Sequence, residues 1–330
     1  MKIKILSRSD VQNSVSMPEA ISIMKKAFVQ LSQGNADMPQ RSSVHGYQEE
    51  GVALIMPAYL KESDSLGTKI VTVFPRNTEK NSPAIHAVFL LLNGRTGKPE
   101  AFMDASFLTA LRTGAASGAA TDLLARRNAC TAAIFGAGVQ GRTQLEAVCH
   151  VRNITKAIIY DKDRAAATLY AEEMKKRGKP IPTNIVPAVS PEDTVQEADI
   201  ICTATSSSTP VFPDEALKTG VHINGIGSFT PHMQEIPEST IRRARIIVDC
   251  LSACLAEAGD LIIPLEKGLI RQDHIAAEIG DVFLGTAVGR RTDEEITFFK
   301  SVGLAVQDVA AAGLVWERAK FLGIGTEVEL

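Results

Sequence analysis

Apolar positions along the chain follow two different periods. Met17–Gln33 repeats them every three or four residues, with Pro18 near its start and Gly34 after its end, which predicts an amphipathic helix. Short runs rich in β-branched and aromatic residues then alternate with turn residues such as Asn93-Gly94. These runs are Val52–Tyr59, Gly67–Phe74, Ile85–Leu92 and Pro99–Met103. They predict an antiparallel meander, and because its open edges are common subunit contacts we expect a homodimer.

Helical spacing returns in Phe107–Arg127, an alanine-rich segment that predicts a long helix. Arg112 lies within the apolar half of this segment. A charged group in such a position is either paired in the core or directed into a cleft. Arg112 is therefore a candidate site residue.

In the second half of the chain, patterns of buried strands alternate with helical ones. The strands are Thr131–Phe135, Lys156–Tyr160, Asp199–Thr205, Val221–Ile226 and Ile246–Asp249. Arg164–Gly178 predicts a helix among them, and Gly303–Leu322 predicts a last helix beyond them. The alternation indicates an α/β fold with a doubly wound parallel sheet and helices on both faces. We expect the last helix to pack on the N-terminal domain, which would make that domain discontinuous.

The strand Thr131–Phe135 ends in Gly136, Gly138 and Gly141, spaced as G-x-G-x-x-G, and a helical segment follows. Such a turn presents backbone N–H groups and a helix N-terminus to a pyrophosphate. Gly136 allows the tight turn, Gly138 lets the phosphate approach, and Gly141 lets the helix and strand pack closely. Glycine turns also serve chain reversal alone. Here Asp161 follows the next strand, about twenty residues on, where an acid meets a ribose hydroxyl, so we favour dinucleotide binding.

Composition indicates which partners, location and cofactors the protein is expected to have. The chain is 45% hydrophobic and 22% charged, with a net charge of −3 and no basic block, so nucleic acid is not an expected partner. No segment has the length of a membrane span, and the N-terminal MKIKILSRSD is too short an apolar run for a signal peptide, so we expect a cytoplasmic protein. The scattered cysteines indicate reduced thiols, and they and the histidines lack metal-ligand spacing, so we expect no metal.

Several longer motifs go beyond these patterns. They are Met38–Ser42 (MPQRS), Leu66–Asn77 (LGTKIVTVFPRN), Leu111–Ser117 (LRTGAAS), Asn224–Pro231 (NGIGSFTP) and Phe299–Ala312 (FKSVGLAVQDVAAA). With the glycine loop, they make the chain resemble the ornithine cyclodeaminase/mu-crystallin family along nearly its whole length. The resemblance implies an α+β substrate-binding and dimerisation domain with an antiparallel sheet, residues 1–128 and 303–330. It also implies a Rossmann domain, residues 129–302.

The resemblance also implies chemistry at the α-carbon of an amino or imino acid. By motif match, Arg41, Lys69 and Arg112 hold the substrate carboxylate, with Lys69 and Arg112 as the catalytic pair. Arg can grip a planar carboxylate with two hydrogen bonds, and Lys can neutralise it as a point charge. The remaining residues expected at the substrate are Met56, Phe229 and Val302.

For the dinucleotide, the glycine loop, the strand ends and the resemblance together indicate one set of residues. They are Gly136, Gly138, Val139, Gln140, Gly141, Asp161, Thr205, Asn224, Gly225, Ile226, Gly227 and Ser301. Asp161 favours NAD(H), because a carboxylate repels the 2′-phosphate of NADP(H). Lys162 and Arg164 lie close by in the sequence and keep NADP(H) as an alternative.

Departures from the cyclodeaminases indicate the reaction. Where those enzymes carry acids, this chain has Phe229 and Leu54, and where they carry a lysine it has Met233. Cyclising ornithine requires positioned acids and bases, which Phe229 and Leu54 do not supply. Reducing a preformed cyclic imine needs a carboxylate clamp, an apolar pocket and a nicotinamide, with Lys69 the nearest candidate proton donor. We therefore predict NAD(P)H-dependent reduction of Δ1-pyrroline-2-carboxylate or Δ1-piperideine-2-carboxylate, giving proline or pipecolate.

Three alternatives remain open at this point. An amino-acid dehydrogenase such as alanine dehydrogenase would share the clamp but use ammonia. An ornithine cyclodeaminase would need another proton carrier, for which the sequence offers His232, expected on a loop surface, and His86, expected in the core. A protein that binds a dinucleotide or small ligand without turnover is the third.

Overall fold

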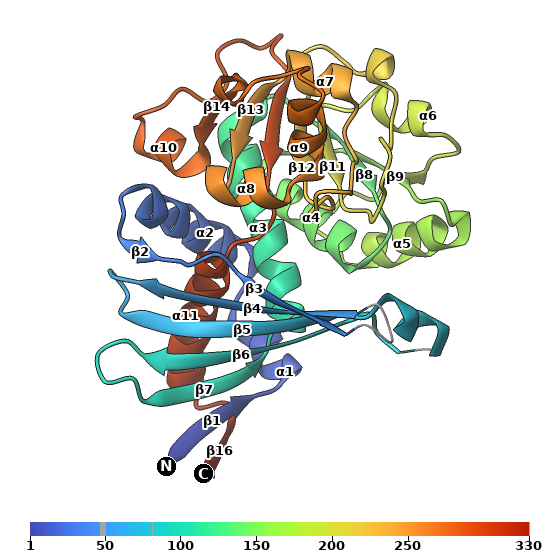
Figure 1. Ribbon diagram of the computed structural model, residues 1–330. Coiled ribbons are helices and arrows are strands. Elements are labelled where there is room, and N and C mark those ends of the chain that lie inside the picture. The colour runs from blue at the N-terminus through green and yellow to red at the C-terminus, as the bar shows by residue number, and fades with distance from the viewer. Residues whose placement is uncertain (47–50, 81, 330) are drawn as a thin grey trace. The chain divides into compact units, whose positions relative to one another are not determined.

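The computed structural model describes residues 1–46, 51–80 and 82–329, which divide into two compact units (Figure 1). The first unit contains residues 1–112 and 304–330, and the second contains residues 113–303. The boundary that we expected after residue 128 falls instead within helix α3 (Ser106–Leu124). The later part of this helix bonds to the second unit, since Asn224 Nδ2 donates to Thr121 Oγ1 at 3.0 Å and Arg290 Nε donates to the Leu124 carbonyl at 2.6 Å.

The first unit is built on a mixed, mostly antiparallel sheet in the order β16-β1-β7-β6-β5-β4-β2, with β3 also paired to β4. The strands are β1 (Lys2–Leu6), β2 (Ala36–Asp37), β3 (Ser42–Gly46), β4 (Gly51–Leu60), β5 (Ser65–Val73), β6 (Ile85–Asn93), β7 (Pro99–Asp104) and β16 (Thr326–Glu329). The antiparallel meander β4 to β7 confirms the prediction. The sequence reading missed β1 and β16, which pair with each other and bring the two ends of the chain together (Figure 1).

Helices cover one face of this sheet. They are α1 (Arg8–Ser14), α2 (Met17–Ser32) and α11 (Ala305–Leu322), and η1 (Pro75–Lys80) is a 3-10 turn between β5 and β6. The α11 helix packs against β4, β5 and β6, and α2 packs against α11. Alternate strand residues point toward these helices, so Met56, Phe89 and Leu91 are fully buried. The residues between them, including Ile55 and Ile70, point to the opposite, exposed face.

The two histidines considered as proton carriers are both exposed. For His232 this confirms the expectation. For His86 the expectation of a core position is wrong. His86 does alternate with apolar neighbours along β6, but its alternation places it on the face of the sheet that no helix of the described chain covers.

The second unit contains a sheet in the order β10-β9-β8-β11-β12-β15-β13-β14, and each neighbouring pair is parallel. The strands are β8 (Thr131–Phe135), β9 (Lys156–Tyr160), β10 (Ile185–Pro187), β11 (Ile200–Thr203), β12 (His222–Gly225), β13 (Arg245–Val248), β14 (Ile275–Glu278) and β15 (Thr297–Lys300). The prediction of a parallel α/β sheet is therefore confirmed. The sequence reading missed β15, which enters between β12 and β13, because its four residues follow an acidic segment and are too few to show a period.

Helices connect these strands. They are α4 (Val139–Val151), α5 (Arg164–Lys176), α6 (Pro191–Val195), α7 (Glu238–Arg243), α8 (Leu251–Glu257), α9 (Gly259–Glu266) and α10 (Ile279–Leu284), with 3-10 turns η2 (Asp214–Ala216) and η3 (Gln272–His274). Strand order runs outward from β8 to β9 and β10 on one side and to β11 and β12 on the other, so right-handed connections place helices on both faces. The carboxyl ends of β8 and β11 meet at the point where the order reverses, which is where such sheets bind ligands.

Across the described ranges, no helix has both the length and the apolar character needed to cross a membrane.

Candidate functional site

Three glycines after β8 occupy three different environments. Gly136 has φ +99°, and a Cβ there would lie 2.6 Å from the Ala204 carbonyl oxygen. A Cβ on Gly141 would clash with the Gly136 carbonyl. Gly138, the N-cap of α4, has open space around it, with nothing within 4 Å of a built Cβ. The loop therefore has a backbone that a ligand can approach at Gly138, next to the N-terminus of a 13-residue helix.

Asp161 lies beside this loop. Its Oδ2 accepts a hydrogen bond from the Ala137 N–H at 2.7 Å, and its Oδ1 accepts one from the Asp163 N–H at 2.9 Å. The glycine loop, Asp161 and the segment after β11 line a common depression of about 440 Å³. Its lining includes the expected residues Gly136, Gly138, Asp161 and Thr205, and also Lys162, Ser206, Ser207 and Thr209. The segment Ser206–Thr209 after β11 is a small polar run in the sequence, but the sequence alone did not indicate a role for it.

Other residues expected at the dinucleotide use their side chains internally. Asn224 is fully buried, and its amide contacts Thr121 at 3.0 Å and His222 at 3.2 Å. The Ser301 hydroxyl donates to Asp249 Oδ2 at 2.7 Å. Gly225 and Ile226 are buried, Gly227 is partly exposed, and Val139 and Gln140 begin α4. Only backbone groups of Asn224 therefore remain for a ligand.

In the first unit, the structure brings two of the three expected cations, Lys69 and Arg112, together around an acid. Lys69 Nζ on β5 lies 2.7 Å from Asp308 Oδ2 on α11, and Arg112 Nε donates to Asp308 Oδ1 at 2.9 Å. Arg112 Nη1 donates to Gln307 Oε1 at 2.9 Å. Lys69, Asp308 and Gln307 are at most 1% exposed, and Arg112 is 5% exposed. Arg112 Nη2 forms no hydrogen bond to the part of the chain that the structure describes, so one edge of the guanidinium remains for a ligand.

The positive charge of this cluster exceeds its negative charge. The pKa of Lys69 is lowered to about 7, mainly by burial; the charges of Arg112 and Arg41 contribute to this lowering, while the ion pair with Asp308 acts in the opposite direction. Met56 faces Lys69 across the β4–β5 ladder and is buried. The arrangement is a net cationic site with an apolar wall, suited to a small carboxylate.

The remaining expected substrate residues, Phe229 and Val302, belong to the second unit. Phe229 is partly exposed in the loop after β12. Val302 is buried, and its N–H donates to Asp249 Oδ2 at 3.0 Å.

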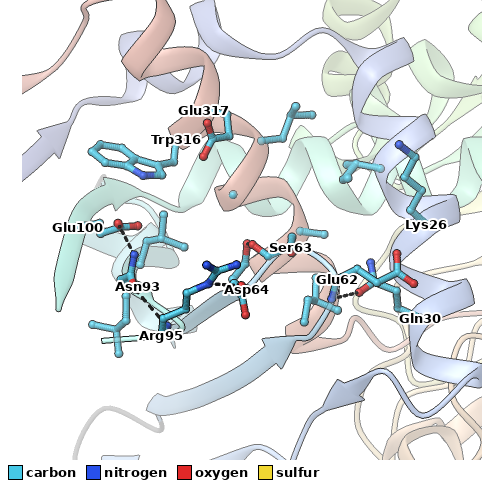
Figure 2. Close-up of a pocket in the computed structure, with 18 of the residues that line it drawn as sticks. Lys26, Gln30, Glu62, Ser63, Asp64, Asn93, Arg95, Glu100, Trp316 and Glu317 are labelled. Carbon is cyan, nitrogen blue, oxygen red and sulfur yellow. Dashed lines mark hydrogen bonds and ion pairs between the residues drawn. The ribbon is translucent and has the colours of Figure 1, made fainter. Parts of the chain in front are cut away.

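A further pocket of about 450 Å³ in the first unit, between α2, α11 and the strand ends, contains none of these cations (Figure 2). Its polar groups bond mainly to each other. Arg95 Nε lies 2.7 Å from Asp64 Oδ2, Asn93 Nδ2 donates to Glu100 at 3.0 Å, and Gln30 accepts from the Glu62 N–H at 3.3 Å. This pocket therefore has no set of unpaired cations for a carboxylate.

Comparison with known proteins agrees with this geometry. The model of the ornithine cyclodeaminase/mu-crystallin family matches residues 1–321. The chain belongs to this family. It is 40% identical over 327 residues to the Δ1-pyrroline-2-carboxylate reductase of Bacillus cereus, covering 98% of this chain and 99% of that one.

Two solved structures of the family are similar over almost the full length. The Δ1-pyrroline-2-carboxylate reductase of Thermococcus litoralis, in complex with NADH and L-proline, has a TM-score of 0.95 and 42% identity, covering 99% of this chain and all of that one. An archaeal alanine dehydrogenase dimer with bound NAD has a TM-score of 0.93 and 35% identity, covering both chains fully. No group of three or more metal-ligating side chains occurs among the residues described in the structure.

Sequence reasoning missed Asp308 and Gln307. Both lie in the segment Phe299–Ala312, which the family resemblance includes, and an acid within an apolar helix is itself a signal. The sequence does not show that this acid meets Lys69 and Arg112, which lie far away along the chain. The structure makes Asp308 the counter-ion of both.

Removing this counter-ion is expected to destabilise the protein. In Asp308→Asn, Lys69 and Arg112 would be buried together without a charge partner, a change that costs about 3–5 kcal/mol. Adding Lys69→Met should recover part of the loss, because it removes one of the two unpaired charges. Denaturant unfolding of the single and double variants measures this coupling. Additive effects of the two substitutions would contradict the ion pair.

Proposed function

We propose that the protein reduces Δ1-pyrroline-2-carboxylate to proline with NADH, and accepts Δ1-piperideine-2-carboxylate as a six-membered analogue. The observation that carries the proposal is the buried Arg112–Asp308–Lys69 cluster, in a chain that is 40–42% identical to Δ1-pyrroline-2-carboxylate reductases over its whole length. Phe229 and Leu54 replace the acids that a cyclodeaminase resembling this chain would use.

In this proposal the cations hold the substrate carboxylate. Asp308 and Gln307 fix the Arg112 guanidinium through its Nε and Nη1 atoms, so the orientation of Nη2 is fixed as well. A guanidinium held in this way loses little side-chain entropy when a carboxylate binds. Lys69 adds a point charge, and Arg41 acts on it electrostatically. The buried Met56 beside Lys69 offers an apolar contact for the ring.

The glycine loop of the second unit fits a dinucleotide. The open backbone at Gly138 and the N-terminus of α4 suit the pyrophosphate, and Asp161 suits a ribose hydroxyl. A bound NADH supplies the hydride that reduces the imine carbon. The NADH and NAD found in the similar reductase and dehydrogenase support this cofactor. Reduced thiols at all five cysteines suit the cytoplasm.

A proton must also be available, because reduction of the imine yields an amine. Lys69 has a pKa of about 7, so near neutral pH both its ammonium and amine forms are populated. We propose that the Lys69 ammonium donates a proton from Nζ to the imine nitrogen as the hydride adds to the imine carbon, which leaves Lys69 as a neutral amine. Asp308 holds Nζ in place and favours its charged form.

We also propose that two copies of the chain pair through the exposed face of the first unit's sheet. Ile55, Ile70 and Phe102 are 37–42% exposed on this face, opposite α11. Ile55 lies directly across from Ile70 on β4 and β5. A continuous apolar sheet face is more often an interface than free surface. The dimer of the similar alanine dehydrogenase supports this pairing.

The activity itself is tested by NADH consumption. We expect turnover of Δ1-pyrroline-2-carboxylate without ammonia, and no ammonia release from ornithine. Arg112→Met should raise the imine KM by about 30-fold or more, because it removes a charged hydrogen bond. Arg95→Met, at an exposed turn, is the matched control and should leave KM unchanged. Activity only with pyruvate and ammonia would instead identify an alanine dehydrogenase.

The pKa of Lys69 predicts a pH dependence of carboxylate binding. Lys69 carries its charge below about pH 7 and loses it above, so an anionic ligand should bind best at low pH. Pyrrole-2-carboxylate is a suitable probe, because it has no basic nitrogen that titrates in this range. Its inhibition constant should be constant below about pH 7 and rise by up to about tenfold per pH unit above it. The rise should disappear in Lys69→Met; a rise that persists there would assign the titration to another group.

The dimer interface is tested by placing a charge on the sheet face. Ile70→Glu should convert the dimer to a monomer, because it would bury a carboxylate in an apolar contact. Leu169→Glu, at a residue 53% exposed on α5, is the matched control and should remain dimeric. Sedimentation velocity measures both. An unchanged dimer of Ile70→Glu would exclude this face as the interface.

A further inference from the structure

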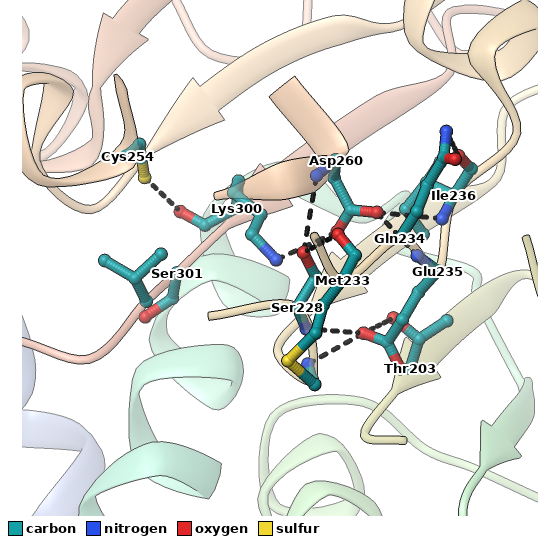
Figure 3. A network of polar contacts seen from close by, with 12 residues as sticks. Thr203, Ser228, Met233, Gln234, Glu235, Ile236, Cys254, Asp260, Lys300 and Ser301 are labelled. Atoms are coloured by element: carbon teal, nitrogen blue, oxygen red, sulfur yellow. Dashed lines mark hydrogen bonds and ion pairs between the residues drawn. The ribbon is translucent and has the colours of Figure 1, made fainter. Parts of the chain in front are cut away.

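A second buried polar network lies in the second unit, where β11 and β12 end (Figure 3). Its centre is the carboxylate of Glu235, which is fully buried and accepts five hydrogen bonds. The donors are Thr203 Oγ1 at 2.8 Å, Thr205 N and Thr205 Oγ1 at 2.7 Å, Gly227 N at 2.7 Å and Ser228 N at 3.2 Å. One side chain thus joins the backbones of two separate strand ends.

The position of Glu235 is itself fixed. Its backbone N–H donates to Asp260 Oδ1 at 2.7 Å, and Asp260 Oδ2 accepts from Lys300 Nζ at 2.9 Å (Figure 3). Asp260 and Lys300 are fully buried as well. Burial raises the pKa of Glu235, and Asp260 adds to this effect, while Lys300 opposes it. Lys300 therefore compensates part of the charge that the two acids bring into the core.

The chemistry of the five donors requires a carboxylate. Three of them are backbone N–H groups, which can only donate, and they divide between the two carboxylate oxygens. An ionised carboxylate offers acceptor sites on both oxygens, whereas an amide has one acceptor oxygen and an NH₂ group that only donates. There is also no space for adjustment at Gly227, where a Cβ would lie 2.5 Å from Glu235 Oε1.

The strand ends that Glu235 joins border the dinucleotide depression. Thr205 lines it together with Gly136, and a Cβ on Gly136 would lie 2.6 Å from the Ala204 carbonyl oxygen. A shift of the Ala204-Thr205 segment would therefore change the space beside the glycine loop. Glu235 itself does not line the depression, so its effect on a ligand there would be indirect.

We propose that Glu235 is a positioning residue for the cofactor: by joining the end of β11 to the end of β12, it fixes the wall that Thr205 presents to NADH. The inference rests on the proposed function, since it assumes that NADH binds at the glycine loop. It predicts an effect on cofactor affinity, separate from the effect of the carboxylate cluster in the first unit.

The test is Glu235→Gln, measured by titrating NADH fluorescence and by steady-state kinetics. In this variant an amide N–H₂ group would face backbone N–H donors, so the strand ends would separate. We expect the KM and dissociation constant for NADH to rise by about tenfold or more, because a charged hydrogen-bond acceptor is lost. The imine KM, and kcat at saturating NADH, should stay within about twofold. A role in stability alone would lower the melting temperature without changing NADH affinity.

Two further variants keep the outcome decisive. Glu238→Gln, at a glutamate that pairs with Lys267 on the surface, is the matched control and should bind NADH normally. Thr203→Val removes one donor to Glu235 and preserves the shape of the side chain, so it serves if Glu235→Gln does not fold. We expect it to weaken NADH binding by a smaller factor. Unchanged NADH affinity in a folded Glu235→Gln, or in Thr203→Val where the former does not fold, would overturn the proposal.

The direct titration separates this inference from the proposed function. If the unmodified protein binds NADH but reduces neither cyclic imine, the proposed reaction is wrong and the role of Glu235 is still measured. If the protein reduces the imine and Glu235→Gln retains normal NADH affinity, the proposed reaction stands and the role of Glu235 is overturned.

Discussion

The ion pairs of Asp308 are the constraint on which the first unit depends. Lys69 and Arg112 are buried close together, and that arrangement is unstable without an opposite charge. Asp308 supplies the charge from α11, which reaches the sheet only after the whole second unit has been traversed along the chain. The last helix therefore completes the first unit chemically, because it supplies the counter-ion for the cations on β5 and α3.

Carboxylates have a similar structural role in the second unit, where parallel strands end and leave backbone N–H groups without partners. Glu235 joins the ends of β11 and β12. Asp249, at the end of β13, accepts from the backbone N–H groups of Val302 and Gly303 after β15. Asp161 accepts from Ala137 after β8. Strand ends that bind a ligand have irregular backbone that must still be held rigidly. A carboxylate can do this, because it accepts hydrogen bonds from several backbone N–H groups at once.

The sequence predicted what depends on local pattern. The strands Thr131–Phe135 and Lys156–Tyr160 and the helix start at Arg164 agree with the structure, because burial and turn chemistry act over a few residues. The cations Arg41, Lys69 and Arg112 came from motif resemblance. The structure pairs Lys69 and Arg112 with Asp308, and the charge of Arg41 acts on Lys69.

What the sequence did not predict depends on partners distant along the chain. The four residues of β15 are a strand only because β12 and β13 flank them. The sequence alone did not indicate the roles of Asp308 and Glu235, because it does not show which hydrogen-bond donors they meet. Asn224 and Ser301 were expected to contact a ligand, but their side chains bond to other residues of the protein. The alternation around His86 is correct, but the sequence does not show which face of the sheet the helices cover, so the exposure of His86 could not be predicted.

We propose that the charge of the Lys69–Arg112–Asp308 cluster favours reduction over cyclodeamination. Burial is the main cause of the lowered pKa of Lys69, and the positive charges of Arg112 and Arg41 act in the same direction against Asp308. We infer that the cations around Lys69, which outnumber Asp308, attract a carboxylate. A second carboxylate in the site would cancel the surplus, raise the pKa of Lys69 and create a place for an ammonium group. A cyclodeaminase needs such a place, because its substrate carries an amine on its side chain. At Leu54, on the same face of β4 as Met56, this chain has an apolar side chain instead. The cationic surplus and the absence of an acid at Leu54 therefore both suit a cyclic substrate that has one carboxylate and no amine on a side chain.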